Sequence, residues 1–364
     1  MKLSHIIRII EEMAPPVLQE SYDNSGLQVG DPNAEISGAL ISLDVTEKVV
    51  EEALTHGCGL IISHHPLIFG EMRSLTGRTP NERTVIMAIR NNIAIYSAHT
   101  SLDNVREGVS KILCERLGIK KTKVLAPRKN LLRKLVTFCP ENEADKVRNA
   151  LFEAGAGHIG DYDSCSFNLP GRGSFRGLEG TDPFVGETGK LHFEDETRLE
   201  VIYPVYLENA VIDAMLDAHP YEEVAYDIYP LENEFSGAGS GMVGYLDQDM
   251  EQSAFLSFVK EKAGSGCVKH SVLTGRKIRK VAVCGGSGAF LIPSAIGEAA
   301  DAFLTGEIKY HDFYKADGKI LLAAIGHYES ERFSKELLMR GVNEKIPNFA
   351  VRLAKTDINP VNYL

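Results

Sequence analysis

An apolar run that ends in two adjacent histidines constrains the fold of this chain more than any other stretch. The run spans Ile61 to Phe69 and predicts a buried strand that ends at His64 and His65. Neighbouring side chains of a strand point to opposite faces, so the two imidazoles cannot both fill one core. The pair therefore indicates metal ligands. The alternative is a pair of surface histidines at a strand end.

A strand-helix-strand unit leads into this stretch. Apolar strands are expected at Ala39–Leu43 and Leu60–Ile62, with an amphipathic helix at Thr46–His56 between them. This connection makes the two strands parallel. Ligands of an open parallel sheet sit beyond the carboxyl ends of its strands. Asp44 and the histidine pair are therefore expected to share one crevice.

The next predicted strand repeats the pattern. Ile93–Ser97 is mostly apolar and is followed by His99 and Asp103. Asp103 is a candidate metal ligand because it follows a strand end, as the histidine pair does. The alternative is that its side chain caps a helix expected at Asn104–Leu117.

The last buried strand has the same kind of ending. Ile320–Ile325 is apolar, and His327 and Glu331 follow it. If a helix begins at His327, these two residues are one turn apart and their Cβ atoms lie about 5–6 Å from each other. That spacing suits one metal ion or two adjacent ions. The alternative is a histidine at a helix start with a solvated glutamate.

Together these strand ends supply three imidazoles and two carboxylates. Nitrogen and oxygen ligands without a thiolate suit zinc, manganese, iron or cobalt in an open catalytic site. Five ligands exceed what one tetrahedral ion needs, and they match two ions about 3.5–4 Å apart. Such a centre implies hydrolysis. The candidate ligands are His64, His65, Asp103, His327 and Glu331.

The middle of the chain differs in character from both ends. Glycines crowd residues 155–189, and a strand-helix-strand order occurs twice between residues 132 and 229. This predicts a smaller α+β, ferredoxin-like domain inserted at 128–235, with Ser236–Gly241 as a flexible return linker. Residues 1–127 and 236–364 are then the first and second halves of one core domain.

The two halves of the core are predicted to be similar. GEAADAFLTGEIKYHDF in the second half repeats the helix, strand and histidine-bearing end of EEALTHGCGLIISHHPLIF in the first. The expected fold class is therefore α/β, with two similar α/β halves interrupted by the inserted domain. In this comparison Glu307 and His311 follow a strand of the second half.

Charge and composition exclude several classes of protein. The chain has 39 basic and 50 acidic side chains and a net charge of −11, so no attraction to nucleic acid or anionic lipid is expected. No uncharged apolar run approaches the roughly 18 residues of a membrane span. The six cysteines form no C-x-x-C pair. A cytoplasmic location is expected.

Six segments, in order along the chain, carry a resemblance to a known family. They are similar to the Nif-three-like family, whose bacterial members are commonly labelled GTP cyclohydrolase 1 type 2 homologues. The resemblance implies that the five candidate ligands hold a dinuclear metal centre. It also implies a homohexameric ring with the metal sites facing an internal cavity. The segments are YDNSGLQVG (22–30), ISHHPLIF (62–69), SAHTSLD (97–103), FLTGEIKYHD (303–312), GHYESERF (326–333) and NPVNYL (359–364).

The middle of the chain resembles the inserted domain of the longer family members. GSFRGLEGTDPFVGE (173–187) and HPYEEVAYDIYPL (219–231) carry this resemblance, and that domain is similar to the PII and CutA trimeric regulators. Tyr22 stands where the family usually has tryptophan, and Gly177 stands where it usually has proline. Neither departure involves a candidate ligand.

The function implied is hydrolysis at two divalent metal ions per subunit, with zinc favoured over iron, manganese and cobalt. A metal-bound hydroxide would open the imidazole ring of GTP or a related purine nucleotide, and His99 or His311 would act as acid or base. Glu307 and Lys309 would orient the substrate. The glycines at 285–288 would cradle a phosphate or form a tight turn.

Two alternatives stay open. The first is a dinuclear hydrolase of another small-molecule class, such as a phosphoester or an amide. The second is a hexameric metal-binding scaffold or regulatory protein without catalytic activity. The five candidate ligands fit both alternatives as well as they fit a GTP cyclohydrolase.

Overall fold

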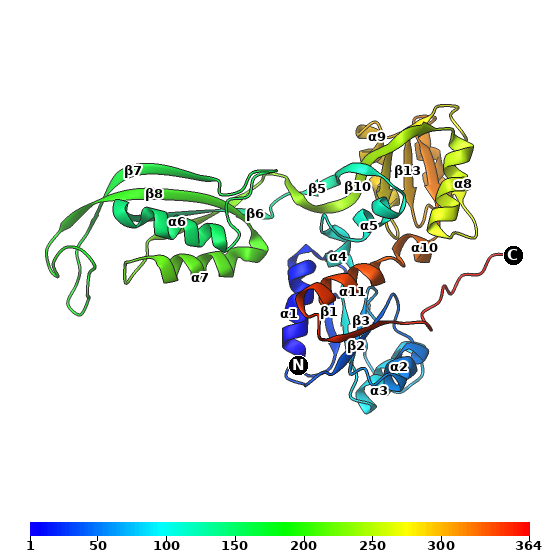
Figure 1. Ribbon diagram of the computed structural model, residues 1–364, viewed down its shortest axis with the longest axis horizontal. Helices are drawn as coiled ribbons and strands as arrows, with labels where there is room; N and C mark the ends of the chain where they lie inside the picture. The colour runs from blue at the N-terminus through cyan, green and yellow to red at the C-terminus, as the bar shows by residue number, and fades with distance from the viewer. The chain divides into compact units, whose positions relative to one another are not determined.

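The computed structural model describes all 364 residues, which form two compact units (Figure 1). The first unit combines Met1–Pro127 with Gly237–Leu364, and the second is Arg128–Ser236. The chain is a mixed α/β protein with several sheets. None of its helices combines the length and the apolar character that a membrane span requires.

The first unit contains a five-stranded sheet in the order β1-β4-β3-β2-β15. All neighbouring strands in it are parallel except β1, which runs antiparallel to β4. Helices cover both faces, which explains why every residue of the three central strands is buried. The strands are β1 (Gly26–Val29), β2 (Gly38–Ser42), β3 (Leu60–Ser63), β4 (Ala94–Ser97) and β15 (Ala350–Leu353).

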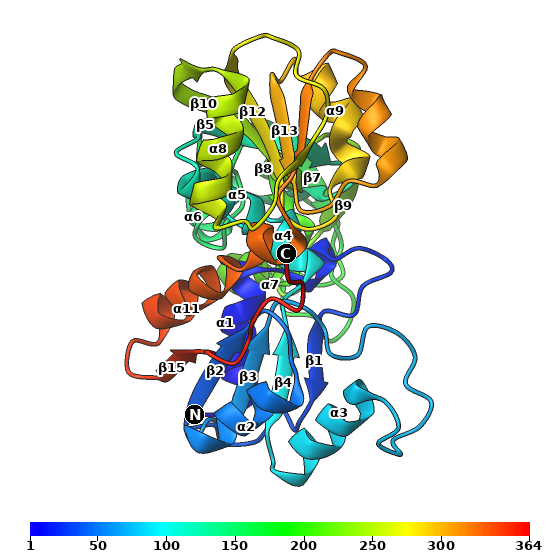
Figure 2. The ribbon, with the colours of Figure 1, turned by 90° about the vertical axis from the view of Figure 1, so that its right-hand side faces the viewer.

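Strand alternation assigns the covering helices to the two faces of this sheet. Leu40, Ile61 and Ile95 form a core with α2 (Glu47–Thr55) and α3 (Pro80–Arg90). The neighbouring side chains of the same strands form the other core, with α1 and α11 (Figure 2). Those two helices span Leu3–Met13 and Ser334–Lys345.

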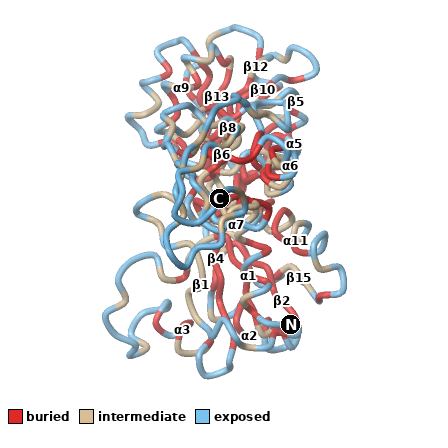
Figure 3. Tube along the Cα trace, turned by 90° about the vertical axis from the view of Figure 1, so that its left-hand side faces the viewer, coloured by how far each residue is buried: buried red, intermediate tan, exposed pale blue.

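A second sheet in the same unit has the order β11-β14-β13-β12-β10-β5. Its centre repeats the three parallel strands of the first sheet, here β12, β13 and β14. Buried residues follow the strands of this unit (Figure 3). The strands are β5 (Lys120–Arg128), β10 (Phe235–Met250), β11 (Lys269–His270), β12 (Ile278–Cys284), β13 (Ala302–Thr305) and β14 (Leu321–Ala324).

Helices also cover this second sheet on both faces. Helix α8 (Gln252–Ala263) packs on one face together with α5 (Val109–Arg116), and α9 (Ile292–Gly297) packs on the other. Two short helices, α4 (Thr100–Asn104) and α10 (His327–Glu331), lie between the two sheets (Figure 1). Both follow the carboxyl ends of central strands, so their side chains reach the space between the sheets.

The second unit has one four-stranded antiparallel sheet in the order β7-β8-β6-β9. Helices α6 and α7 lie on the same side of this sheet (Figure 1) and close a core with Leu135, Leu199 and Val201. The elements are β6 (Leu132–Pro140), α6 (Ala144–Glu153), β7 (Ser166–Phe175), β8 (His192–Pro204), α7 (Glu208–Ala218) and β9 (Tyr226–Leu231).

The prediction of a flexible linker at Ser236–Gly241 is wrong. These residues lie within the long strand β10, which starts at Phe235 and pairs with β5. A Cβ atom at Gly239 would lie 2.2 Å from the carbonyl oxygen of Ala126 and 2.8 Å from the Cα of Pro127. Only glycine fits at this position, because the two backbones approach closely. The glycine therefore marks a tightly packed strand pair and not a flexible linker.

We expect Gly239→Ala to destabilise the first unit. The added methyl group would collide with backbone atoms of β5, and such overpacking costs about 1–3 kcal/mol of unfolding free energy. Thermal unfolding monitored by circular dichroism measures the change. The control is Gly297→Ala in α9, where no atom lies within 4 Å of the added Cβ. An unchanged midpoint in Gly239→Ala would contradict the close approach.

The helix predicted at Asn104–Leu117 is interrupted. Helix α4 ends at Asn104, and α5 begins at Val109. A Cβ atom at Gly108 would lie 1.9 Å from the carbonyl oxygen of Leu102, so the chain folds back tightly between the two helices. Asp103 therefore lies inside α4, and the alternative in which it caps a longer helix is wrong.

Candidate metal centre

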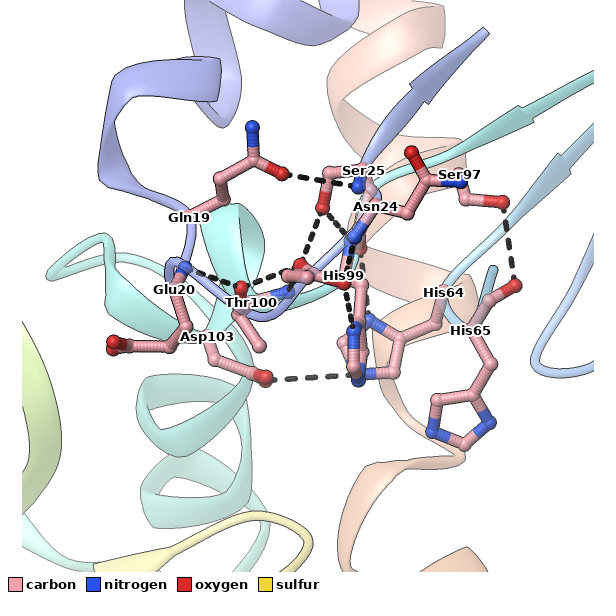
Figure 4. Close-up of polar contacts among 12 residues, drawn as sticks. Gln19, Glu20, Asn24, Ser25, His64, His65, Ser97, His99, Thr100 and Asp103 are labelled. Atoms are coloured by element: carbon pink, nitrogen blue, oxygen red, sulfur yellow. Dashed lines mark hydrogen bonds and ion pairs between the residues drawn. The ribbon is translucent and has the colours of Figure 1, made fainter. Parts of the chain in front are cut away.

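His64 presents one ring nitrogen to the space between the two sheets. Its Nδ1–H donates to the carbonyl oxygen of Ala98 at 2.9 Å, which leaves the lone pair on Nε2 free. His64 is fully buried, so the alternative of a surface histidine pair is wrong. Its Nε2 lies 3.5 Å from Oδ1 of Asp103, and neither atom has a hydrogen-bond partner (Figure 4).

His65 is held at both ring nitrogens by carboxylates. Nδ1 lies 2.9 Å from Oδ1 of Asp44, at the end of β2, and Nε2 lies 2.9 Å from Oε2 of Glu331. Adjacent parallel strands bring Asp44 and His65 together, as expected for their shared crevice. Asp44 fixes the orientation of the imidazole and raises the basicity of its other nitrogen.

Glu331 faces the imidazoles from the opposite side. Its carboxylate is almost fully buried, and Oε2 lies 2.9 Å from Nε2 of both His65 and His327. Oε1 lies 3.9 Å from Nε2 of His64. A Cβ atom at Gly286 would lie 2.2 Å from Oε1, so this glycine leaves room for the carboxylate.

The ligand atoms fall into overlapping groups whose members lie within 4.8 Å of one another. One group is His64, Asp103 and Glu331, and a second is His65, His327 and Glu331. Glu331 belongs to both. Two buried polar atoms in the first group lack partners, which is costly unless a further group satisfies them. These histidines and carboxylates could therefore hold a metal ion.

His99 lies beside the cluster and is oriented by Asp23, which is not among the site residues that the sequence predicts. Its Nδ1 lies 2.7 Å from Oδ1 of Asp23, and His99 forms a third group with His64 and His65 (Figure 4). The other oxygen of Asp23 accepts hydrogen bonds from Thr100 and from the hydroxyl of Ser25. Asp23 and His99 are 76 residues apart along the chain, so their contact depends on the fold.

Glu307 lies beside the cluster, but His311 does not. Oε1 of Glu307 is 3.4 Å from Nδ1 of His327, and its Oε2 accepts a hydrogen bond from Ser287 at 2.8 Å. His311 is exposed on the 3-10 helix η5 (Tyr310–Ala316), where its ring contacts two tyrosines. It does not line the cavity described below.

The glycines at 285–288 form a tight strand-to-helix turn. The N–H of Gly286 donates to the hydroxyl of Ser330, and the N–H of Gly288 donates to the hydroxyl of Thr305, both at 2.9 Å. These donors are occupied by the protein itself. The phosphate-cradle alternative is therefore not supported by the hydrogen bonding of this turn.

A cavity of about 900 Å³ opens onto the cluster within the first unit. His65, His99 and His327 line it together with the carboxylates of Asp103 and Glu331. Lys269 is the only lysine or arginine in its wall, and the rings of Tyr22, Phe69 and Phe290 add apolar surface. The cavity can admit a drug-sized ligand with an aromatic part.

The charges of the cluster shift the pKa of its members. Burial alone would lower the pKa of His65, but hydrogen bonds with Asp44 and Glu331 raise it to about 10. The pKa of His327 is also raised, against its burial, by Glu331. Burial would raise the pKa of Glu331, but the surrounding imidazoles hold it well below its usual value. In the absence of a metal ion the imidazole of His65 is therefore protonated at both ring nitrogens at neutral pH.

We expect metal binding to release protons. Only an unprotonated nitrogen binds a metal ion, and the pKa of His65 of about 10 means that its proton must leave at pH 7. Isothermal titration calorimetry of zinc into metal-free protein, in buffers of different ionisation enthalpy, should give about one proton or more released per chain. The number should fall as the pH approaches 10. A heat that is independent of the buffer would contradict the expectation.

Asp44→Asn should weaken metal binding without unfolding the protein. The change removes the negative charge beside Nδ1 of His65, and loss of such a partner costs about 10–100-fold in metal affinity. A competition titration with a chromogenic chelator measures the affinity. Asp145→Asn on the exposed surface of α6 is the control. Equal affinities for both variants would show that Asp44 does not support the cluster.

Comparisons with known proteins cover the chain from end to end. A family model described as Duf34/NIF3 (NGG1p interacting factor 3) matches residues 1–361. A Bacillus subtilis (strain 168) protein named GTP cyclohydrolase 1 type 2 homolog is 37% identical over 99% of this chain and 98% of its own length. A Halalkalibacterium halodurans protein of the same name is 39% identical over 94% of this chain and 91% of its own length.

Solved structures agree with these similarities. The crystal structure of a Bacillus cereus protein related to NIF3 matches with a TM-score of 0.88 and 37% identity, and covers 100% of this chain and 99% of its own. A Staphylococcus aureus protein matches with a TM-score of 0.77 and 28% identity over 100% of this chain and 99% of its own. The mixed α/β fold is thus shared along the whole chain.

Proposed function

Because this chain belongs to the DUF34/NIF3 family, we propose that its buried cluster is the dinuclear metal centre of a hydrolase. The observation that carries the proposal is the position of Glu331. One carboxylate oxygen faces His64, and the other faces His65 and His327. A carboxylate shared by two ligand groups suits a bridge between two metal ions.

The proposed ligands are His64, His65, Asp103, His327 and Glu331. His64, Asp103 and Glu331 would hold one ion, and His65, His327 and Glu331 would hold the other. The unpartnered atoms of His64 and Asp103 support this assignment, because a bound cation would satisfy both. We propose zinc as the first candidate, and this donor set also accepts iron, manganese or cobalt.

Two divalent ions would supply a nucleophile by lowering the pKa of a water, and would polarise the substrate. Around them, Asp44 and Glu307 orient the imidazoles of His65 and His327. We propose His99 as the group that moves a proton. Asp23 accepts the Nδ1–H of His99, so Nε2 is the nitrogen left for exchange with a ligand in the cavity.

For the substrate we propose a small molecule of the purine nucleotide class. The proposal rests on the names of the relatives, which are GTP cyclohydrolase 1 type 2 homologs, and on the rings in the wall of the cavity. Lys269 would contact an anionic group of such a substrate. The chemistry would be hydrolytic opening of the imidazole ring of GTP, with release of formate.

The test is GTP turnover by protein of measured metal content. Formate and the ring-opened triphosphate are followed by chromatography, beside a panel of phosphate esters and amides under the same conditions. Formate release from GTP in proportion to bound metal supports the proposal. Hydrolysis of an ester or amide without formate release would assign the centre to another class of substrate. No turnover of any compound by fully metallated protein would favour a scaffold without catalytic activity.

We also propose the finer features of organisation that the family resemblance implies. The second unit would be a ferredoxin-like domain inserted into a core of two similar halves, which its strand-helix-strand repeat and sheet order support. The chain would assemble as a homohexamer, which sedimentation analysis tests. Six free cysteines support residence in the reducing cytoplasm.

A further inference from the structure

The second unit contains a cavity of its own, of about 630 Å³, on the face of its sheet that no helix covers. We propose that this cavity binds a small ligand made of a planar aromatic ring and one anionic group, such as a carboxylate, sulfonate or phosphate. Every residue that lines it belongs to the second unit. The proposal therefore does not depend on the function proposed for the metal centre.

Strand register identifies the floor of this cavity. Helices α6 and α7 cover the face that carries Leu199 and Val201 (Figure 1). Alternate residues of the strands point the other way, and there Phe138, Arg198 and Leu169 lie directly opposite one another on β6, β8 and β7. This row of side chains forms one end of the cavity floor.

Two glycines hollow the floor beside this row. Gly171 and Gly173 follow Leu169 at the next two positions on the same face of β7. A Cβ atom at Gly173 would lie 2.1 Å from Oε2 of Glu196, so this side chain fills the space there. Above Gly171 the only atom within 4 Å of an added Cβ is the carbonyl oxygen of Glu196, at 3.8 Å. A flat group can therefore approach the backbone at Gly171.

Aromatic rings form the wall. The centroid of the Tyr221 ring lies 6.1 Å from that of Phe175 and 6.3 Å from that of Phe184. The hydroxyl of Tyr221 donates to Oε1 of Glu196 at 2.8 Å, which fixes the ring. Phe184 is 52% exposed, so a bound ring would remove its apolar surface from water.

Arginines with free hydrogen-bonding capacity supply the charge. The guanidinium of Arg198 lies over the ring of Phe138 at 5.9 Å, and only its Nε contacts an acid, Glu200. Arg176 makes no hydrogen bond or ion pair and is exposed at the cavity. The terminal nitrogens of both arginines remain available, and a guanidinium fork recognises carboxylate, sulfonate and phosphate oxygens.

The lining holds three glutamates beside its three arginines, and hydrogen bonds orient two of these carboxylates. Glu196 already accepts from Tyr221, and Glu222 accepts from the backbone N–H of Asp182. Glu223 is exposed. The glutamates keep their charge, but none of them contacts the terminal nitrogens of Arg176 and Arg198. The hollowed floor, the fixed rings and these available guanidinium groups together fit an aromatic anion.

The test is a fluorescence titration of the full-length protein with 1-anilinonaphthalene-8-sulfonate, an aromatic sulfonate. Gly171→Leu fills the hollow, and Arg198→Met removes the charge while keeping a side chain of similar length. Each should weaken binding about tenfold or more, which corresponds to 1.4 kcal/mol or more. Lys146 is exposed on α6, the helix that covers the opposite face of the sheet. Lys146→Met should therefore leave the affinity unchanged.

A neutral probe, N-phenyl-1-naphthylamine, separates the ring from the charge. Its affinity should fall in Gly171→Leu and stay constant in Arg198→Met. Equal affinity for the sulfonate in the wild type and both variants would overturn the proposal. So would an equal loss of both probes in Arg198→Met, because the arginine would then act through packing. An unfolding curve of each variant, measured in the titration buffer, tests whether the second unit is folded under those conditions.

Discussion

Glu331→Gln should strip the cluster of metal and abolish hydrolysis. The amide keeps the shape of the side chain but replaces one anionic oxygen by an NH₂ group, which would face ring nitrogens at about 2.9 Å. Changes in outer partners of a metal site cost up to about 100-fold in affinity, and loss of a ligand shared by both groups should cost more. Metal per chain by mass spectrometry and hydrolysis of the best substrate measure both effects.

Glu336→Gln is the matched control. It makes the same chemical change on α11, where Glu336 pairs with Arg116 at a half-exposed position. A surface pair of this kind contributes about 0–1 kcal/mol, so metal content and turnover should stay at the wild-type level. Full metal content in Glu331→Gln would rule out a shared carboxylate. Loss of turnover in both variants would point to a general effect on folding.

Asp103→Asn should remove one of two metal ions and leave the other. Asp103 belongs only to the group with His64 and Glu331, and the group of His65 and His327 does not contain it. Metal content should therefore fall by about one ion per chain, with hydrolysis reduced by at least the 10–100-fold typical of outer partners. Metal analysis after dialysis against a weak chelator gives the stoichiometry.

The reciprocal variant tests whether the two groups are separable. His327→Gln should lose the other ion and keep the one beside Asp103. A double variant should then bind none. If either single variant loses both ions, the two groups act as one site. If neither variant loses an ion, a bound metal ion does not explain why Nε2 of His64 and Oδ1 of Asp103 lack hydrogen-bond partners.

The sequence predicted the strand ends that carry ligand-type side chains, because a strand followed by polar residues is a local pattern. His64, Asp103 and Glu331 follow strands of two different sheets, and the structure brings their ligand atoms into one cluster. The two sheets themselves were not separable by local pattern. Their existence depends on which strands pair, and pairing is decided by contacts between distant residues.

The residues that orient or make room for the candidate ligands could not be predicted either, because their roles also depend on contacts between distant parts of the chain. Asp23 lies in a segment that has every feature of an ordinary turn, and its contact with His99 depends on the fold. Glycine has two uses that look alike in a sequence, which are flexibility and close approach. Gly239 and Gly286 serve the second use. The analogy between the halves predicts His311 at the site, but its side chain is exposed on the 3-10 helix η5 and does not line the cavity.

The ligands on the two sides of the cluster lie far apart in the sequence, so they are synthesised at different times. His65 and Glu331 are separated by 266 residues. At a synthesis rate of about 5–20 residues per second, roughly 13 to 53 s pass between their emergence from the ribosome. A nascent chain that has been made through α4 holds His64, His65 and Asp103 but lacks His327 and Glu331 during that time. Capture of an ion by the full set thus marks a chain that has been made past α10.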